Sequence, residues 1–197
     1  KLDTYIEKEL SGENSQLNQA ENISYVGAID IGTNSTHLLI AAVDTVLKTF
    51  SIELAEKSTT RLGERDPNTG ELTALAMNRA FSTLKRFKEL SESYKVDSLI
   101  IAATSAVREA PNGRVFISEI KKKIGLDVEL ISGAEEARLI YLGVLSGMQF
   151  GDKPHLVLDI GGGSTELILG DSSEARALTS TKIGAVRLQR EFIKKDP

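Results

Sequence analysis

The sequence predicts an α/β fold organised as two similar lobes, and two observations carry this prediction. The first is a strand–turn–strand segment that occurs twice, at residues 25–40 and again at residues 156–169. The second is the alternation, between these segments, of short apolar stretches with longer stretches that have the spacing of helices. Two related hairpins around a mixed α/β segment predict two half-domains that face one ligand from opposite sides.

The second of these segments has a turn suited to a bound phosphate. Three consecutive glycines, Gly161–Gly163, remove every Cβ atom from the turn, so its amides can lie directly against an anion. Ser164 and Thr165 add hydroxyl groups, and Asp159 and Glu166 place one carboxylate at each end of the loop. Carboxylates suit the hard Mg²⁺ ion that accompanies polyphosphates. The alternative is a tight hairpin whose glycines only turn the chain, which needs fewer residues and no pair of carboxylates.

The first segment repeats this pattern near the N-terminus. An apolar strand again ends in Asp-Ile-Gly, continues into a small polar turn and leads to a second apolar strand. One Asp-x-Gly is weak evidence, whereas two of them inside strand–turn–strand segments predict a pair of phosphate loops. The matched positions are Asp30 with Asp159, Gly32 with Gly161, and Ser35 with Ser164.

The composition limits the class of protein. The 197 residues include 41% hydrophobic and 26% charged residues, an ordinary balance for a globular protein. The absence of cysteine excludes disulfides, and the presence of only two histidines argues against a zinc site. A net charge of −4 argues against a general binder of nucleic acid or membranes. No apolar run approaches the ~20 residues of a membrane span, so we expect a cytoplasmic enzyme.

The first half of the chain supplies the elements of an α/β lobe. After a polar leader at residues 1–24, the hairpin strands at 26–31 and 37–43 are followed by a third strand at 50–55. Helical spacing of apolar residues predicts a helix over 72–94, and a buried strand follows at 96–102. A second helix over 113–124 ends at Gly125, and residues 127–131 form the next strand.

Two arginines lie in loops beside these elements. Arg108 ends a loop of small residues, 103–108, at the C-terminal end of a strand, where α/β sheets bind ligands. It could form a bidentate contact with phosphate, and the alternative is an ion pair with Glu109 or another neighbour. Arg61 precedes a turn cluster at residues 66–70, and by itself it is interpreted as a solvated loop charge.

A helix that begins after Ser132 carries two adjacent glutamates with different expected roles. Ser132 is suited to cap the helix, and Glu135 occupies the reciprocal capping-box position. Neighbouring helical residues differ by roughly 100° around the axis, so the two glutamates cannot share one role. Glu135 lies nearly opposite the apolar stripe, whereas Glu136 lies on its flank. Glu136 therefore fits a half-buried carboxylate that points into a cleft.

The chain changes character near residue 150. Residues 147–154 are rich in turn formers, and the predicted boundary there separates a first lobe at 25–150 from the start of a second lobe at 151–197. A hairpin, a strand near 177–181 and a helix beginning near residue 184 are too few elements for a whole lobe. We expect the first lobe to be complete, the second to be only partly present, and the chain to be a fragment.

The paired loops resemble those of the superfamily of actin, sugar kinases and heat-shock chaperone ATPases. Within it, the chain from about Val26 onward resembles the exopolyphosphatase and guanosine pentaphosphatase family. The resemblance implies lobes with the actin-like, or ribonuclease H-like, α/β fold. It rests on five segments in the family's order: Ile29–Ser35, Arg61–Glu64, Ala103–Arg108, Ile131–Ile140 and Asp159–Glu166.

The resemblance also implies an activity. It predicts a phosphohydrolase that releases terminal orthophosphate from inorganic polyphosphate or from guanosine pentaphosphate, the alarmone of the stringent response. The alternatives are an ATP-binding protein similar to actin or sugar kinases, and a non-catalytic sensor of polyphosphate or alarmone. The resemblance further implies a homodimer of the full-length protein, and no nucleic-acid or membrane partner is expected.

The resemblance assigns expected roles to individual residues. The second glutamate, Glu136, becomes the base that activates water. Three carboxylates are expected to hold Mg²⁺ or Mn²⁺: Asp30, Asp159 and Glu166. The expected phosphate-binding residues are Gly32, Thr33, Asn34, Ser35, Arg61, Arg108, Gly161, Gly162, Gly163, Ser164 and Thr165.

Overall fold

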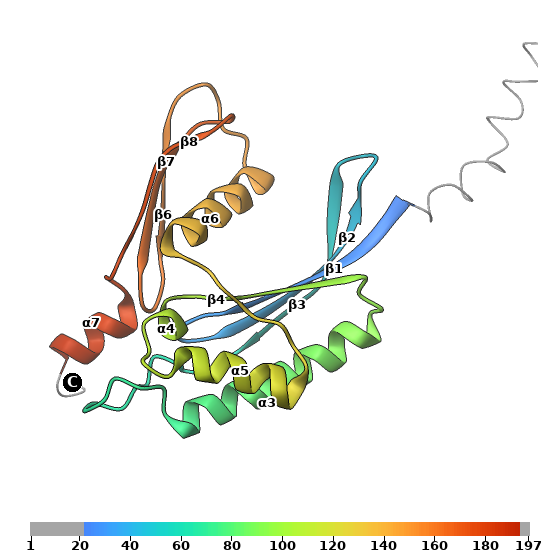
Figure 1. Cartoon of the computed structure of the whole chain (residues 1–197). Helices are drawn as coiled ribbons and strands as arrows, with labels where there is room; N and C mark the ends of the chain where they lie inside the picture. The colour runs from blue at the N-terminus through green and yellow to red at the C-terminus, as the bar shows by residue number, and fades with distance from the viewer. Residues whose placement is uncertain (1–21, 194–197) are drawn as a thin grey trace, which may run out of the picture.

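The computed structural model describes residues 22–193 of the chain, which form two α/β units (Figure 1). Nearly all of the predicted polar leader, residues 1–24, lies outside the described residues; its last two, Ile23 and Ser24, begin the first strand. No helix within the described part of the chain is long and apolar enough to cross a membrane.

The first unit is a five-stranded sheet with the strand order β3-β2-β1-β4-β5. Strands β1 (Ile23–Ile31), β2 (Thr36–Asp44) and β3 (Thr49–Ser58) form an antiparallel meander. Strands β4 (Ser98–Ala103) and β5 (Glu129–Leu130) run parallel to β1, as crossover helices allow. Strand β5 is shorter than predicted, with two residues in place of five.

Alternation along β1 and β2 separates the core from the ligand side of this sheet. Ile29 and Ile31 are buried on one face together with Leu38 and Ile40 of β2. Asp30, between two buried neighbours, must point to the opposite face. The same alternation that builds the core therefore presents the loop carboxylate to the other side of the sheet.

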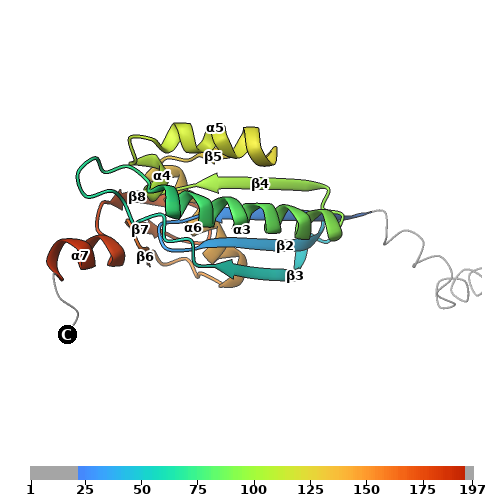
Figure 2. The ribbon, with the colours of Figure 1, turned by 90° about the horizontal axis from the view of Figure 1, so that it is seen from below.

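Two helices cover the core face of the sheet, as Figures 1 and 2 show. They are α3 (Ala74–Ser93), which Thr73 caps, and α5 (Gly113–Ile124), which ends at Gly125 with a left-handed φ of 78°. Phe87 and Phe116, one from each helix, are fully buried in this core. Both helices are close to the predicted ranges.

A short helix, α4 (Ser105–Arg108), occupies the segment predicted to be a loop. The amides of Val107 and Arg108 both donate to the Thr104 carbonyl, which closes one helical turn directly after β4. A single turn has too few residues to show periodicity, and this is why the sequence did not reveal it. Arg108 is the last residue of this turn, so the turn sets the position of its side chain relative to the end of β4.

The second unit is an antiparallel sheet of β6 (His155–Ile160), β7 (Thr165–Gly170) and β8 (Ala175–Thr181), in that order. Helix α6 (Gly133–Gly147) packs against β7 and β8, and its Tyr141 shares a small core with Ile168. The predicted division at residues 150/151 stays a prediction, but these contacts favour a division before α6. The turn-forming residues at 147–154 indicated where α6 ends, but they did not indicate which of the two sheets α6 covers.

The last described helix, α7 (Ala185–Phe192), connects the two units. Its first amides, from Ala185 and Val186, donate to the carbonyls of Gly161 and Gly162. From the same helix, Arg190 donates to the carbonyl of Gly63 in the first unit over 2.9 Å. Helix α7 therefore sits at the base of the second phosphate loop and holds it near the first unit.

Candidate active site

The two predicted phosphate loops have the same hairpin geometry. In the first, the Gly32 amide donates to the Ser35 carbonyl over 3.1 Å, and in the second the Gly161 amide donates to the Ser164 carbonyl over 3.0 Å. The strand registers also match, because Asp30 pairs with His37 and Asp159 pairs with Glu166. The repeat seen in the sequence is thus a repeat of structure.

The amides of Gly32 and Gly161 close their own turns, so they do not point at a ligand. Within the described residues, the hydrogen-bond network leaves the next three amides of each turn, at 33–35 and 162–164, without a protein acceptor. Those amides are the groups that a phosphate could engage.

The loops touch each other, and this contact explains one of the three glycines. A Cβ atom on Gly163 would lie only 2.5 Å from the Thr33 hydroxyl and would also collide with Ser105. The Thr33 and Ser105 hydroxyls are hydrogen-bonded to each other over 2.9 Å. Gly163 therefore serves the close approach of the two lobes, in addition to the anion contact expected from the sequence.

The two loop aspartates line one cavity of about 650 Å³ between the units. Asp30 and His37 enter it from the first sheet, while Asp159 and Glu136 enter it from the second unit. The two aspartates thus face one cleft, as expected, while the turns that follow them are in contact with each other. Apolar side chains such as Leu139 form much of the remaining wall.

Asp30 is reachable by solvent from the cavity, yet dense protein surrounds its carboxylate. This burial raises the pKa of Asp30 above its usual value, and the nearby charge of Asp159 raises it further. The charge of His37 acts in the opposite direction. Two carboxylates that repel each other across a cavity form a site that a cation would stabilise.

Glu136 is the most strongly perturbed carboxyl group of the cleft. Its side chain is 16% exposed and lies 3.2 Å from the guanidinium of Arg108. Burial, together with the charges of Glu166 and Asp30, raises the pKa of Glu136 to about 7, although Arg108 opposes this shift. A carboxylate with a pKa near neutrality is suited to general-base catalysis.

Glu135 points away from the cleft, as the helical geometry predicted. Its amide donates to the Ser132 hydroxyl, which caps α6. The prediction that the Glu135 carboxylate accepts a hydrogen bond from the backbone at the start of the helix is wrong. Both of its oxygens accept from Arg138 instead, over 2.8 and 2.7 Å. An arginine one turn ahead competes better for an exposed carboxylate than a single amide does.

The Arg108 guanidinium contacts other groups of the protein in this structure. It donates to the Ile131 carbonyl over 2.8 Å and pairs with Glu136, so its partner is not the neighbouring Glu109. Arg108 also lines a second cavity, of about 620 Å³, together with Ser164 and Lys182. Because Arg108 and Glu136 line different cavities and contact each other, the two spaces adjoin at this ion pair.

Arg61 lies near the first loop through its backbone and not through its charge. Its amide donates to the Asn34 carbonyl over 2.8 Å, and its φ of 52° is left-handed. The guanidinium is largely exposed and lies 3.5 Å from Glu64. The structure therefore does not bring the Arg61 charge to the carboxylates of the cleft.

A divalent cation fits Asp30 and Asp159 better than it fits Glu166. Glu166 is 1% exposed and accepts a hydrogen bond from the Ser180 hydroxyl over 2.7 Å. Among residues 22–193, no three His, Asp or Glu side chains are grouped closely enough to hold a metal by themselves. Mg²⁺ characteristically uses one or two carboxylates and completes its shell with water and substrate phosphates, so two aspartates are sufficient.

Sequence reasoning missed several basic residues near the loops. Lys182 lies beside Ser164, and three arginines, Arg65, Arg187 and Arg190, gather where α7 meets the first unit. Arg187 donates to the Gly163 carbonyl and pairs with Glu109 over 2.7 Å. For Arg187 and Arg190 the only sequence signal was the predicted helix after Gly184, which gave no reason to place them beside the first unit.

Comparisons with known proteins agree with this geometry. The family model described as the Ppx/GppA phosphatase family matches residues 39–197. The chain is 40% identical, over 166 residues, to a guanosine-5'-triphosphate,3'-diphosphate pyrophosphatase of Photobacterium profundum. It is 34% identical, over 173 residues, to exopolyphosphatase 1 of Mycobacterium leprae.

Crystal structures of related proteins show the same fold. An exopolyphosphatase from Cytophaga hutchinsonii matches with 40% identity and a TM-score of 0.83 over 88% of this chain. The Aquifex aeolicus member of the Ppx/GppA family matches with 35% identity and a TM-score of 0.74 over 89% of this chain. The predicted α/β fold is confirmed, and it is the fold of these two related structures.

The matches cover more of this chain than of its relatives. They include 84% and 87% of this chain, but only 33% and 50% of the two curated relatives. For the two crystal structures the share is 55% and 56%. The family match extends over most of the 197 residues. The chain belongs to the Ppx/GppA phosphatase family.

Proposed function

We propose that the protein is a phosphohydrolase that releases terminal orthophosphate from inorganic polyphosphate, guanosine pentaphosphate or both. The observation that carries this proposal is the position of Glu136. It shares one cavity with the aspartates of both phosphate loops, and its pKa is raised to about 7. The names of the relatives support this substrate class, since they are a guanosine-5'-triphosphate,3'-diphosphate pyrophosphatase and an exopolyphosphatase.

Glu136 would act as the general base. In its deprotonated form it accepts a proton from a water molecule in the cleft, and the water oxygen attacks the terminal phosphorus. The bridging P–O bond breaks, and the shortened chain leaves with the electron pair of that bond. Hydrolysis of this kind depends mainly on positioning and charge stabilisation, so one well-placed carboxylate is enough protein chemistry.

Arg108 and Ser164, which line one cavity, would hold the terminal phosphate. Arg108 reaches Glu136 on one side and the cavity of Ser164 and Lys182 on the other. A phosphate in that cavity would compete with Glu136 for the guanidinium. Substrate binding would thus release the base from its ion pair at the moment the phosphate arrives.

Asp30 and Asp159 would hold a divalent cation, Mg²⁺ or Mn²⁺. When bound, the cation would neutralise negative charge on the phosphate oxygens. Glu166 would have a positioning role. It is buried, accepts a hydrogen bond from Ser180, and lies opposite Asp159 in the strand register, so it would support the position of Asp159. The expected homodimer, the cytoplasmic location and the absence of nucleic-acid binding stay predictions.

Orthophosphate release from defined substrates tests the proposal. The protein is incubated with Mg²⁺ and either long-chain polyphosphate, guanosine pentaphosphate, or ATP with a phosphate acceptor. We expect release from at least one of the first two substrates. Phosphate transfer from ATP would identify a kinase-like enzyme instead, and tight binding of polyphosphate without any release would identify a sensor.

A further inference from the structure

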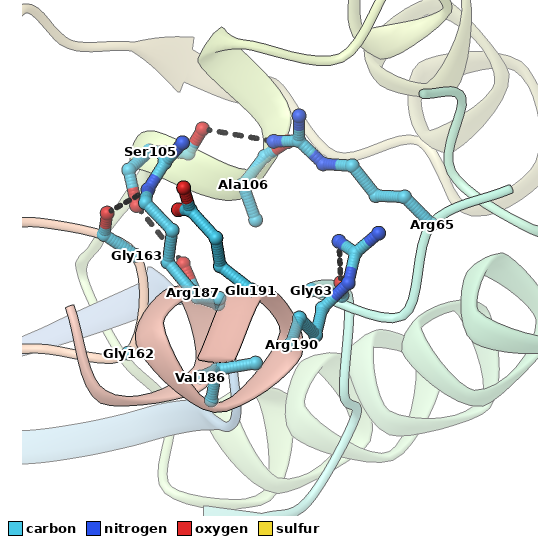
Figure 3. Close-up of a pocket in the computed structure, with 11 residues that line it drawn as sticks. Gly63, Arg65, Ser105, Ala106, Gly162, Gly163, Val186, Arg187, Arg190 and Glu191 are labelled. Carbon is cyan, nitrogen blue, oxygen red and sulfur yellow. Dashed lines mark hydrogen bonds between the residues drawn. The ribbon is translucent and has the colours of Figure 1, made fainter. Parts of the chain in front are cut away.

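A smaller cavity lies on the side of the phosphate loops that faces α7, apart from the carboxylates of the cleft. Its volume is about 270 Å³, and Thr33, Gly162 and Gly163 form its wall on the side of the loops. Three arginines also line it, and we call this cavity the arginine pocket. Figure 3 shows that Arg187 and Arg190 come from α7, whereas Arg65 comes from the loop after β3.

The contacts of these arginines leave most of their hydrogen-bonding capacity free. Arg65 donates to the Ala106 carbonyl over 2.7 Å, and Arg190 donates to the Gly63 carbonyl over 2.9 Å. Within residues 22–193, Arg187 is the one member of the three that pairs with a carboxylate, that of Glu109. Each guanidinium carries five N–H donors, so unused donors remain on all three.

The charges of the three arginines repel one another. Burial lowers the pKa of Arg65, and the charges of Arg187 and Arg190 lower it further, although Glu109 acts in the opposite direction. Guanidiniums held together in this way are a recognised arrangement for binding phosphate-like anions, because their planar forks match such oxygens.

One carboxylate lines the pocket but does not neutralise it. Glu191 of α7 stands among the arginines in Figure 3, without an ion pair to another described residue. Even with Glu109 and Glu191 both counted, three arginines face two carboxylates. The volume is below the roughly 300–1,000 Å³ of pockets for organic ligands, and it suits a small inorganic ion.

We propose that the arginine pocket binds a small oxyanion of the phosphate class, either free orthophosphate or the end of a short polyphosphate. This site goes beyond the proposed catalytic cleft and does not depend on turnover there. An anion in the pocket would contact Thr33 and Gly163, which belong to different loops. Its binding would therefore be linked to the spacing of the two loops.

Titration of the protein with orthophosphate, followed by the NMR signal of the Arg187 side-chain N–H, tests this site. Arg65→Gln, Arg190→Gln and the double variant are compared with Arg114→Gln, which removes an exposed arginine of α5. We expect orthophosphate to shift the signal, and we expect the double variant to weaken this binding about tenfold or more, as loss of charge-assisted hydrogen bonds does. Arg108→Gln, in the cleft, should leave the response of this signal unchanged.

A parallel titration with tripolyphosphate separates the two sources of the anion. A response at lower concentration than orthophosphate would identify a chain end as the ligand, and the reverse would identify the free ion. An Arg187 signal that neither anion shifts in the folded wild-type protein would overturn the proposal. An equal loss in Arg114→Gln would also overturn it. The wild-type titration shows whether the arginine pocket binds an anion even if an arginine variant fails to fold. A protein without turnover in the cleft would still give this result.

Discussion

Glu136 combines a raised pKa with a cationic neighbour, and both properties should appear in the pH dependence of the reaction. A general base must be deprotonated, so we expect activity to rise with pH through a midpoint near 7, the pKa of Glu136. Arg108 lowers this pKa, so Arg108→Gln should move the midpoint to higher pH while also weakening substrate binding. Arg138→Gln, which removes the partner of Glu135, is the matched control. A midpoint that stays in place in Arg108→Gln would contradict the assignment.

The same group makes a prediction about stability. Because the pKa of Glu136 is about 7 in the folded protein and 4.5 in the reference state, the folded state binds more protons between these values. The contribution of Glu136 to stability is therefore present below pH 4.5 and is lost as the pH rises through 7. We expect Glu136→Gln to stabilise the protein at pH 8 by on the order of 1–3 kcal/mol, after allowance for partial solvent screening. Thermal unfolding at pH 5 and pH 8 measures this, and an equal effect at both values would contradict it.

Asp159 should determine the requirement for metal. A carboxylate gains nothing from direct contact with a phosphate oxygen, and the proposed cation would separate the two. We expect Asp159→Asn to raise the Mg²⁺ concentration for half-maximal activity about tenfold or more, with a smaller effect on polyphosphate binding. Asp127→Asn, at an exposed ion pair with Lys121, should change neither. An unaltered Mg²⁺ requirement in Asp159→Asn would show that Asp159 serves only the hairpin.

At the scale of elements, the two hairpin loops pack against each other. Gly163→Ala would place a methyl group against Thr33 and Ser105, which are buried and hydrogen-bonded. We expect a loss of about 1–3 kcal/mol of stability, as overpacking produces, and a large loss of activity because the loops are displaced. Gly143→Ala in α6 meets no neighbouring atom and should be neutral or slightly stabilising. Wild-type activity in Gly163→Ala would contradict the importance of this contact.

Helix α6 carries the proposed base, Glu136, close to its capped N-terminus. Ser132→Ala removes the hydroxyl that accepts the Glu135 amide, so we expect a loss of about 1 kcal/mol in unfolding free energy. Glu135→Gln should cost less, because its ion pair with Arg138 is exposed. Chemical denaturation of both variants measures the difference, and an equal or larger loss in Glu135→Gln would contradict the capping role of Ser132.

The elements that the sequence predicted well are those with a strong local pattern. Both hairpins, α3 and α5 follow from alternation, helical spacing and glycine signals within each segment. Helix α4 could not be predicted because one turn has no periodicity. The packing of α6 on the second sheet was also missed, since an apolar stripe does not say which surface it covers. The arginine pocket depends on tertiary placement of α7, for which the sequence has no local signal.

At the scale of the whole molecule, the candidate site exists only because two units meet. Asp30 comes from the first sheet, Asp159 from the second sheet and Glu136 from the helix that covers it, and all three line one cavity. Contacts across the junction set their spacing, including the hydrogen bond from Arg190 to the Gly63 carbonyl and the Arg187–Glu109 ion pair. The repeated loop in the sequence predicted that the two units face each other. The raised pKa of Glu136 follows from this arrangement, because burial and the charges of Glu166 and Asp30 cause it.

Rates of orthophosphate release by Glu136→Gln and Glu135→Gln, measured beside the wild type on the same substrate, show whether Glu136 is the general base. The two substitutions are chemically identical and adjacent on α6, but only Glu136 faces the cleft. We expect a rate about 10²–10⁴-fold lower in folded Glu136→Gln, the usual contribution of a general base, and a nearly normal rate in Glu135→Gln. Equal losses in the two variants, or a wild-type rate in Glu136→Gln, would contradict it.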